Sequence, residues 1–160
     1  MEAPSDVERA GSPVVVASDE LSWDELTALV DKVVALIRER ERENGWLPSM
    51  IIALSRGGFV PATLIASRLG VRNLVGVDVQ KDALGIRSIG RYVKLDRVDE
   101  HRVLIVDDGI VTGNLLPTTA DEVASKGGDP RTCALVSEGR CAEPDYLGEI
   151  RQHMPHFPWE

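Results

Sequence analysis

The sequence has 160 residues, of which 43% are hydrophobic and 28% charged, a composition that favours one globular domain over a disordered chain. Its formal net charge of −8 argues against DNA or RNA as a partner, because nucleic-acid binding usually requires a basic surface. No apolar run approaches the ~20 residues of a membrane span, and Cys133 and Cys141 have neither metal-site nor disulfide spacing. We therefore expect a cytoplasmic protein with no nucleic-acid or membrane partner.

The first predicted helix follows a short leader. Residues 1–11 lack the basic start and apolar stretch of a signal peptide. Residues 1–20 are expected to form a partly flexible leader. Ser22 and Glu25 have the spacing of a capping box, which predicts that a helix begins there. Apolar residues then recur at helical spacing as far as Ile37, and Gly45 is the expected end of the helix.

Beyond this helix, short and continuously apolar runs alternate with helical patterns. Such runs are typical of strands that are buried on both faces of a parallel sheet. The predicted strands span residues 50–54, 74–79, 102–106 and 132–136, and the predicted helices begin at Pro61 and Pro117. Residues 80–91 are expected to be a long loop, and the tail from Glu138 is expected to be irregular. The alternation predicts an α/β fold with a doubly wound, mainly parallel sheet.

An acidic pair, Asp107 and Asp108, directly follows a predicted strand. A buried carboxylate needs a partner, and sugar hydroxyls or a hydrated Mg²⁺ are suitable ones. Thr112, Gly113 and Asn114 then precede a predicted helix, so their N–H groups can gather around one anion. Carboxylates for hydroxyls beside amides for a phosphate predict a ribose 5-phosphate site, although an acidic pair and a Thr-Gly turn also occur in ordinary loops.

A second polar segment follows the predicted strand 50–54. It reads Ser55-Arg56-Gly57-Gly58, in which two glycines allow the main chain to approach a ligand closely and Arg56 can donate to phosphate oxygens. An ordinary turn with a surface arginine is the alternative interpretation. Ligands of open parallel sheets bind beyond the carboxyl ends of the strands, where both segments are expected to lie. Their coincidence at one sheet edge favours a binding site.

Together these motifs resemble those of the type I phosphoribosyltransferases, and most closely the xanthine-guanine/hypoxanthine branch of that family. The resemblance extends from about Trp23 to Glu160. Residues 103–114 resemble the family's phosphoribosyl pyrophosphate signature, and residues 55–58 resemble the pyrophosphate loop of the branch. Residues 144–146 and 157–160 resemble its small C-terminal hood. This likeness implies that residues 21–137 form a phosphoribosyl pyrophosphate-binding core and that residues 138–160 form the hood segment of the same domain.

The resemblance also implies roles for individual residues. The enzyme would move ribose 5-phosphate from phosphoribosyl pyrophosphate to a nucleobase-like acceptor and release pyrophosphate, with Mg²⁺ as cofactor. Homodimers or homotetramers are expected by the same analogy. The implied catalytic and metal-binding residues are Asp107 and Asp108. The implied 5-phosphate site consists of Thr112, Gly113 and Asn114, and the implied pyrophosphate site consists of Ser55, Arg56, Gly57 and Gly58. The basic residues of a loop that closes over the site would be Lys81, Arg87 and Arg91.

The acceptor half of the site departs from the family pattern. Val111 stands where the family usually has a proton-accepting Asp, and Leu115 stands where a hydroxyl usually helps to hold the 5-phosphate. No Lys follows the last core strand, and the base-stacking aromatic is replaced near Met154. The candidate acceptor pocket therefore consists of Val111, Ser137, Glu138 and His153, with Glu138 or His153 handling the proton.

These departures argue against a standard 6-oxopurine as acceptor, because a lost donor to a substrate oxygen weakens discrimination. A nucleobase-like acceptor of another kind is the leading hypothesis. Two alternatives remain open: a non-catalytic regulatory or accessory protein that binds phosphoribosyl pyrophosphate or a nucleotide, and a hydrolase of such ligands. A phosphoryl-accepting receiver domain leaves the Thr-Gly turn unexplained.

Overall fold

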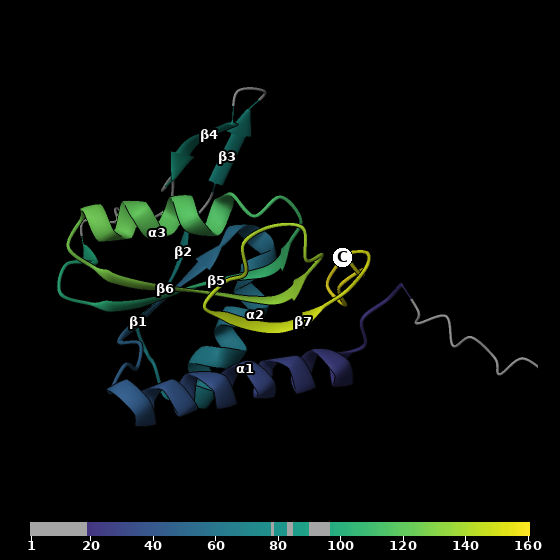
Figure 1. The fold of residues 1–160 in the computed structure, drawn as a ribbon, viewed down its shortest axis with the longest axis horizontal. Helices are drawn as coiled ribbons and strands as arrows, with labels where there is room; N and C mark the ends of the chain where they lie inside the picture. Colours follow the sequence, from purple (N-terminus) through teal and green to yellow (C-terminus); the bar gives the residue numbers. More distant parts are fainter. Residues whose placement is uncertain (1–18, 78, 83–84, 90–96) are drawn as a thin grey trace, which may run out of the picture.

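The computed structural model describes residues 19–77, 79–82, 85–89 and 97–160. Strands and helices alternate along most of this part of the chain (Figure 1). In chain order the elements are α1 (Trp23–Asn44), β1 (Met50–Leu54), α2 (Ser55–Leu69), β2 (Leu74–Val77), β3 (Val79–Asp82), β4 (Gly85–Ile89), β5 (Arg102–Ile110), α3 (Leu115–Ser125), β6 (Asp129–Ser137) and β7 (Tyr146–Ile150).

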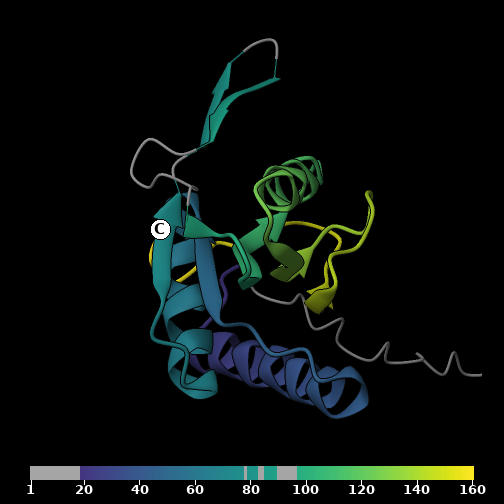
Figure 2. The ribbon, with the colours of Figure 1, turned by 90° about the vertical axis from the view of Figure 1, so that its left-hand side faces the viewer.

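The main sheet of the described residues has five strands in the order β2-β1-β5-β6-β7, and all four neighbouring pairs are parallel. Helix α3 covers one face of the sheet, and α1 and α2 cover the other (Figures 1 and 2). Strand β5 lies in the middle, where Ile105 is in register with Ile52 of β1 and with Thr132 of β6. The predicted doubly wound parallel sheet is confirmed.

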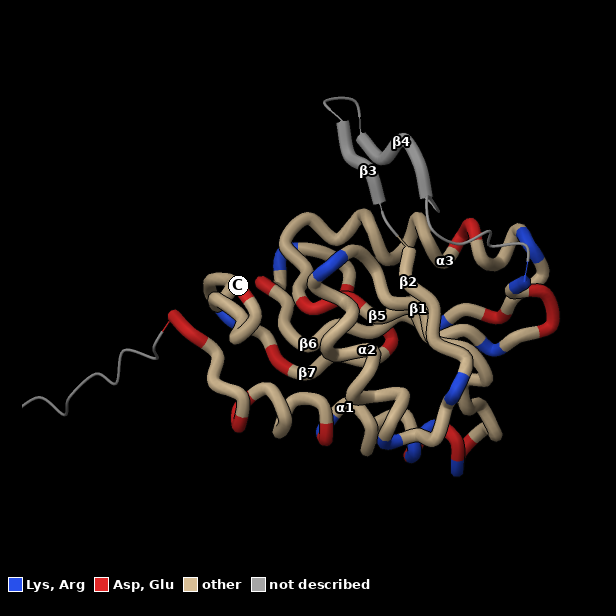
Figure 3. The backbone as a smooth tube through the Cα atoms, turned by 180° about the vertical axis from the view of Figure 1, so that it is seen from behind, with Lys and Arg blue, Asp and Glu red and all other residues tan. Residues whose placement is uncertain are grey.

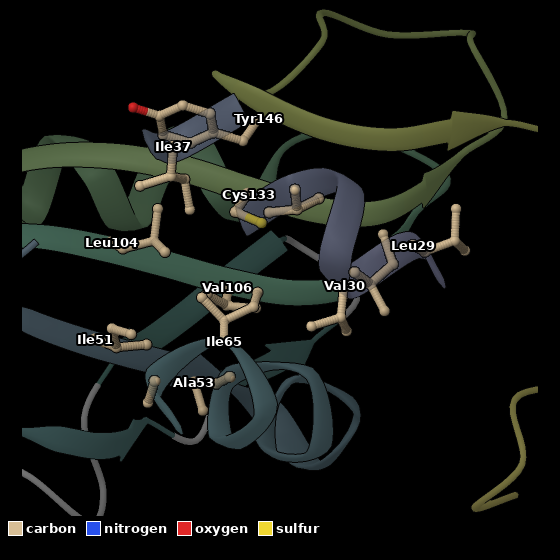
Figure 4. Packing of buried hydrophobic residues seen from close by; sticks show 14 of the residues in the cluster. Leu29, Val30, Ile37, Ile51, Ala53, Ile65, Leu104, Val106, Cys133 and Tyr146 are labelled. Atoms are coloured by element: carbon tan, nitrogen blue, oxygen red, sulfur yellow. The ribbon is translucent and has the colours of Figure 1, made fainter. Parts of the chain in front are cut away.

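The core has one layer on each face of the sheet because successive residues of a strand point to opposite faces. Leu104 and Val106 of β5 pack in the cluster that α1 and α2 cover, part of which Figure 4 shows. Val103 and Ile105, which alternate with them, pack under α3. A sheet covered by helices on both faces therefore requires strands that are apolar at every position. Strand β1 is an example, because it is buried along its whole length.

The ends of α1 agree with the sequence signals. Ser22 accepts a hydrogen bond from the Glu25 N–H (3.1 Å), and the Glu25 carboxylate accepts one from the Ser22 N–H (2.8 Å). Gly45 ends the helix in the left-handed region, with φ of 74°. Acidic and basic residues are mixed along the outer surface of α1 (Figure 3). The helix therefore buries one apolar side and leaves the other in solvent.

The structure corrects several predicted boundaries. Helix α2 begins at Ser55, so the segment expected to be a loop forms its first turn and Pro61 lies inside the helix. Strand β5 extends to Ile110 and includes the acidic pair, because it stays paired with β6 as far as Ser137. The tail expected to be irregular contains β7, which is parallel to β6. This edge strand could not be recognised from the sequence, because it contains Gly148 and Glu149, and neither residue type is typical of a buried strand.

Residues 80–91 were expected to form a loop, but their described part belongs to an antiparallel hairpin of β3 and β4. Among the described residues the two strands pair only with each other, and they stand away from the main sheet on the side of α3 (Figures 1 and 2). A strand outside the main sheet does not need the apolar run that identifies core strands. Lys81 lies in β3 and Arg87 in β4, whereas Arg91 lies outside the described residues.

Within the described ranges, every helix is too short or too polar to cross a membrane.

Candidate active site

The acidic pair lies at the carboxyl end of β5, the central strand. Asp107 and Asp108 are half-buried, and the strand backbone holds both: Asp107 Oδ1 accepts from the Asp108 N–H at 2.9 Å, and Asp108 Oδ1 accepts from the Gly109 N–H at 2.7 Å. Burial raises the pKa of Asp108, and the nearby Glu160 carboxylate adds to this rise. A buried carboxylate of this kind favours a ligand that brings hydroxyl donors or positive charge.

The first turn of α2 packs directly against this pair. A Cβ atom added at Gly57 would lie 2.1 Å from Asp108 Oδ2, and one added at Gly58 would lie 2.5 Å from the Val106 carbonyl oxygen. Both distances are shorter than a Cβ contact allows, so a side chain at either position would force its neighbour to move. The two glycines therefore permit α2 to begin against the end of β5, which brings the predicted pyrophosphate and ribose segments together.

The start of α2 has the geometry of an anion site. Its N-cap residue is Leu54, and no side chain of the described residues caps the helix there. Ser55 has φ of 52°, an uncommon left-handed conformation for a residue with a side chain. Arg56 is exposed on the same turn. The first N–H groups of the helix therefore lack a side-chain acceptor and lie beside a cation, which suits a phosphate group.

A second turn joins β5 to α3. Gly113 has φ of 72°, and a Cβ atom added there would lie 2.5 Å from Cys141 Sγ, so both the conformation and the space require glycine. Thr112 and Asn114 are exposed on either side of it, and Asn114 is the N-cap of α3. The predicted 5-phosphate segment is therefore a tight turn at a helix N-terminus.

A hollow is lined by both Asp107, the first residue of the acidic pair, and this turn. It has a volume of about 170 Å³. Its walls are Asp107, Gly109, Ile110, Val111, Thr112, Gly113, Leu115 and Leu116. The lining thus combines a carboxylate, a glycine turn and apolar side chains. This combination suits a ligand that carries both hydroxyl groups and an anionic group.

The four candidate acceptor residues are not brought together in this hollow. Val111 lines it and is 49% exposed, but Ser137 is fully buried and its Oγ accepts from the Gly139 N–H at 3.0 Å. Glu138 Oε1 accepts from the Met154 N–H at 3.0 Å, and His153 is exposed. Ser137 and Glu138 therefore already have hydrogen-bond partners within the chain.

The structure gives specific contacts to three residues of the hood segment, Met154, Phe157 and Glu160, which the sequence did not pair with any residue of the site. A Cβ atom added at Gly109 would lie 2.4 Å from Met154 Sδ and 3.6 Å from Phe157 Cε2, so the hood segment packs on the residue that follows the acidic pair. Glu160 raises the pKa of Asp108 through its charge, which places it near the same carboxylates. The available signal was Gly109 itself, since a glycine in a strand often marks a close approach of other atoms.

A metal ion would find only part of its ligands in the protein. Within the described residues, no three His, Cys, Asp or Glu side chains converge in a way that could hold a metal ion. Asp107 and Asp108 supply carboxylate oxygens, which Mg²⁺ prefers, and Mg²⁺ commonly keeps waters and substrate oxygens as its other ligands. The acidic pair therefore fits an ion that arrives with a phosphorylated substrate.

The comparisons with known proteins agree with this geometry. Residues 22–160 match the family described as the phosphoribosyl transferase domain. The xanthine-guanine phosphoribosyltransferase of Chromohalobacter salexigens is 30% identical over 143 residues, which are 88% of this chain and 82% of that protein. The crystal structure of a purine phosphoribosyltransferase from Pyrococcus horikoshii Ot3 matches with a TM-score of 0.68 and 29% identity, over 88% of this chain and 92% of that one. The xanthine-guanine-hypoxanthine phosphoribosyltransferase of Helicobacter pylori has a TM-score of 0.70 with the same coverage, and at 16% identity it supports the fold alone.

Proposed function

Because the chain belongs to the phosphoribosyl transferase domain family and is therefore a phosphoribosyltransferase, we propose that it transfers ribose 5-phosphate from phosphoribosyl pyrophosphate to a nucleobase-like acceptor, with release of pyrophosphate. One observation carries this proposal. Asp107 and the Thr112-Gly113 turn line the same hollow, so one small ligand could contact a carboxylate and the N–H groups of a glycine turn together.

Each part of the donor has a suitable partner. The ribose hydroxyls would donate to Asp107 and Asp108, and the 5-phosphate would accept from the N–H groups of Thr112, Gly113 and Asn114. The pyrophosphate would lie at the start of α2, at Ser55, Arg56, Gly57 and Gly58, because Gly57 packs on Asp108 and no side chain of the described residues caps that helix. Lys81, Arg87 and Arg91 are proposed to reach the same pyrophosphate from the segment that contains β3 and β4.

Asp107 and Asp108 would also hold Mg²⁺, directly or through the sugar. When bound, Mg²⁺ supplies positive charge that stabilises the negative charge of the departing pyrophosphate. Asp108 would gain most from this positive charge, because burial disfavours the ionised form of its carboxyl group.

The transfer reaction depends mainly on the positioning of the two substrates and on the stabilisation of charge in the transition state. A nitrogen of the acceptor attacks the anomeric carbon and its proton passes to water, while the bond from that carbon to the pyrophosphate oxygen breaks and pyrophosphate leaves with the bonding electrons. The sugar carries positive charge as this happens, so carboxylates fixed beside the ribose stabilise the transition state. Asp107 and Asp108 are held there by the strand backbone, which limits the reorganisation needed during the reaction.

We propose that the acceptor is a nucleobase other than a standard 6-oxopurine. Val111 cannot accept a proton, and neither Ser137 nor Glu138 can donate to a purine oxygen as a lysine ammonium group does. Two relatives bear names that specify xanthine, guanine or hypoxanthine, so these bases are the appropriate comparison. The transferase proposal and the acceptor proposal can fail separately.

A continuous assay of pyrophosphate release tests both. Purified protein with phosphoribosyl pyrophosphate and Mg²⁺ is supplied in turn with xanthine, guanine, hypoxanthine, adenine and pyrimidine bases. Release that depends on one of the last two classes supports both proposals, whereas fast release with a 6-oxopurine overturns the acceptor proposal and keeps the transferase. Mg²⁺-dependent donor binding without release for any base would instead favour a binding protein, and release without a base would indicate a hydrolase.

A further inference from the structure

The end of the hood, residues 151–160, contacts the site at Gly109. Met154 Sδ occupies the space that a side chain at Gly109 would fill, and Phe157 lies beside it. The ribose, 5-phosphate and pyrophosphate sites proposed above take up the acidic pair, the Gly113 turn and the start of α2. The acceptor must approach the sugar from a side that these three leave open. Under the proposed function this is the side at Gly109, directly after the acidic pair, and it is called the acceptor side.

Glu138 connects this part of the hood to the sheet. Its N–H donates to the Ile110 carbonyl oxygen at 3.1 Å, which fixes it at the ends of β5 and β6. Its Oε1 accepts from the Met154 N–H at 3.0 Å, and its Oε2 lies 3.5 Å from Arg140 Nε. The side chain is only 12% exposed. Both carboxylate oxygens thus have partners, and one partner is the backbone of the residue that packs on Gly109.

We propose that Glu138 is a positioning residue, which holds Met154 and Phe157 at the acceptor side of the site through its hydrogen bond to the Met154 N–H. This inference rests on the proposed function, because only that function assigns an acceptor to this side of the site. It assigns Glu138 no proton transfer, since an oxygen that already accepts a hydrogen bond inside the fold is poorly placed to take a proton from a substrate.

Two conservative variants of Glu138 separate the effect of side-chain length from the effect of charge. Glu138→Gln keeps an oxygen at the same distance from the Met154 N–H and removes the charge, whereas Glu138→Asp keeps the charge and shortens the side chain by one methylene. A positioning role requires a side chain long enough to accept the hydrogen bond from the Met154 N–H. The Gln variant should therefore behave like the wild type, and the Asp variant should not. A proton-transfer role requires a carboxylate, so it predicts the opposite order. Glu143→Asp and Glu143→Gln, at an exposed glutamate in the same loop, are the matched controls.

Two readouts are compared. In steady-state kinetics, Glu138→Asp should raise the KM for the acceptor about tenfold, the scale of losing one hydrogen bond to a charged group, with the KM for phosphoribosyl pyrophosphate nearly unchanged. In hydrogen–deuterium exchange, amides of residues 151–160 should exchange about tenfold faster in that variant by the same reasoning. Both values should stay within about twofold of wild type in Glu138→Gln and in the controls.

The exchange measurement needs no activity, so it tests the positioning of the hood even if no acceptor is found and the proposed function fails. Equal exchange of residues 151–160 in all variants would overturn the proposal, and so would a loss of activity in Glu138→Gln that Glu138→Asp does not share. If Glu138→Asp proves less stable, it is compared with Glu138→Gln at a temperature at which both variants are folded: faster exchange confined to residues 151–160 in Glu138→Asp supports the proposal, and equal exchange in the two variants overturns it.

Discussion

At the scale of single residues, Asp108 shows a conflict between stability and binding. The end of β5 and the first turn of α2 enclose its carboxylate so closely that a methyl group at Gly57 would overlap it. Burial, with a further contribution from Glu160, raises its pKa. The folded protein therefore holds a carboxylate in a position that disfavours its ionised form, as is common where a charge is kept for a ligand.

The Asp108→Asn variant tests this conflict. Because the pKa of Asp108 is higher in the folded than in the unfolded chain, the folded state binds the proton more tightly, and wild-type stability falls as the pH rises from the ordinary carboxyl range through the raised pKa. Asparagine keeps an oxygen that can accept from the Gly109 N–H and does not ionise. At pH 7 we expect the variant to have a Tm roughly 2–4 °C above wild type, a typical shift for a point change in a chain of this length.

The gain in Tm should shrink as the pH is lowered towards 4, which calorimetry at several pH values can follow. The same variant should lose Mg²⁺-dependent binding of phosphoribosyl pyrophosphate in a calorimetric titration. A variant that is less stable than wild type at pH 7, or that binds the donor normally, would contradict this account of Asp108.

Gly57→Ala tests the packing of α2 on the acidic pair. The added methyl would meet Asp108 Oδ2 at 2.1 Å, so either the carboxylate or the first turn of α2 must move. Displacement of about 1 Å at a reacting group can cost on the order of 100-fold in rate. We expect kcat/KM for phosphoribosyl pyrophosphate to fall by about that factor.

Gly70→Ala is the control for Gly57→Ala. It ends the same helix with φ of 72° and has open space around it, so the change should lower stability by about 1 kcal/mol and leave the kinetics unchanged. Equal kinetic losses in the two variants would show that the effect of Gly57→Ala is general destabilisation.

At the scale of elements, the sequence predicts those parts whose signals are local. The capping box at Ser22 and the glycine at position 45 locate α1, and the apolar run at residues 50–54 gives β1 without error. The start of α2 could not be predicted, because the sequence Ser55-Arg56-Gly57-Gly58 looks like a loop, although it forms the first turn of the helix. Only their contact with β5 shows that they begin a helix.

Strand β7 and the β3–β4 hairpin show a second limit. Their identity depends on partners: β7 exists because β6 offers it a free edge, and β3 and β4 exist because they pair with each other. Asp145 illustrates the first case, since its carboxylate accepts from the Thr132 N–H at 2.8 Å and fixes the chain just before β7 to β6. Such long-range contacts leave little trace in local sequence patterns.

The turn between β5 and α3 carries a prediction at the same scale. Leu115 is the first residue of α3 and lines the hollow beside Thr112 and Gly113, where an apolar side chain gives a phosphate nothing to bind. Leu115→Thr places a hydroxyl there and is compatible with a helix start. We expect the KM for phosphoribosyl pyrophosphate to fall roughly three- to tenfold, as one neutral hydrogen bond would give.

Leu115→Val is the matched control, because it has nearly the shape of threonine and no hydroxyl. It should leave the KM at or above the wild-type value. A lower KM in both variants would attribute the change to side-chain volume, and an unchanged KM in Leu115→Thr would remove position 115 from the 5-phosphate site.

At the scale of the whole molecule, the site exists only because the sheet gathers segments far apart in the sequence. The start of α2, the end of β5 and the turn before α3 meet at the carboxyl edge of the sheet, and residues 151–160 close it from the hood. The sequence places the first three there through the rule for parallel strands. It could not place the hood contacts, since Met154, Phe157 and Glu160 reach Gly109 and Asp108 through folding of the tail.

A ligand that binds several of these segments at once should stabilise the whole fold. Phosphoribosyl pyrophosphate with Mg²⁺ would bind the folded state alone, so at 100 times its Kd it adds about 2.7 kcal/mol to the free energy of unfolding. For a chain of 160 residues this corresponds to a rise in Tm of roughly 5–10 °C. The rise should require Mg²⁺ and should vanish in Asp108→Asn. Ribose 5-phosphate lacks the pyrophosphate and is expected to give a smaller rise, because it leaves the start of α2 unoccupied; equal rises for the two ligands would mean that α2 does not bind pyrophosphate.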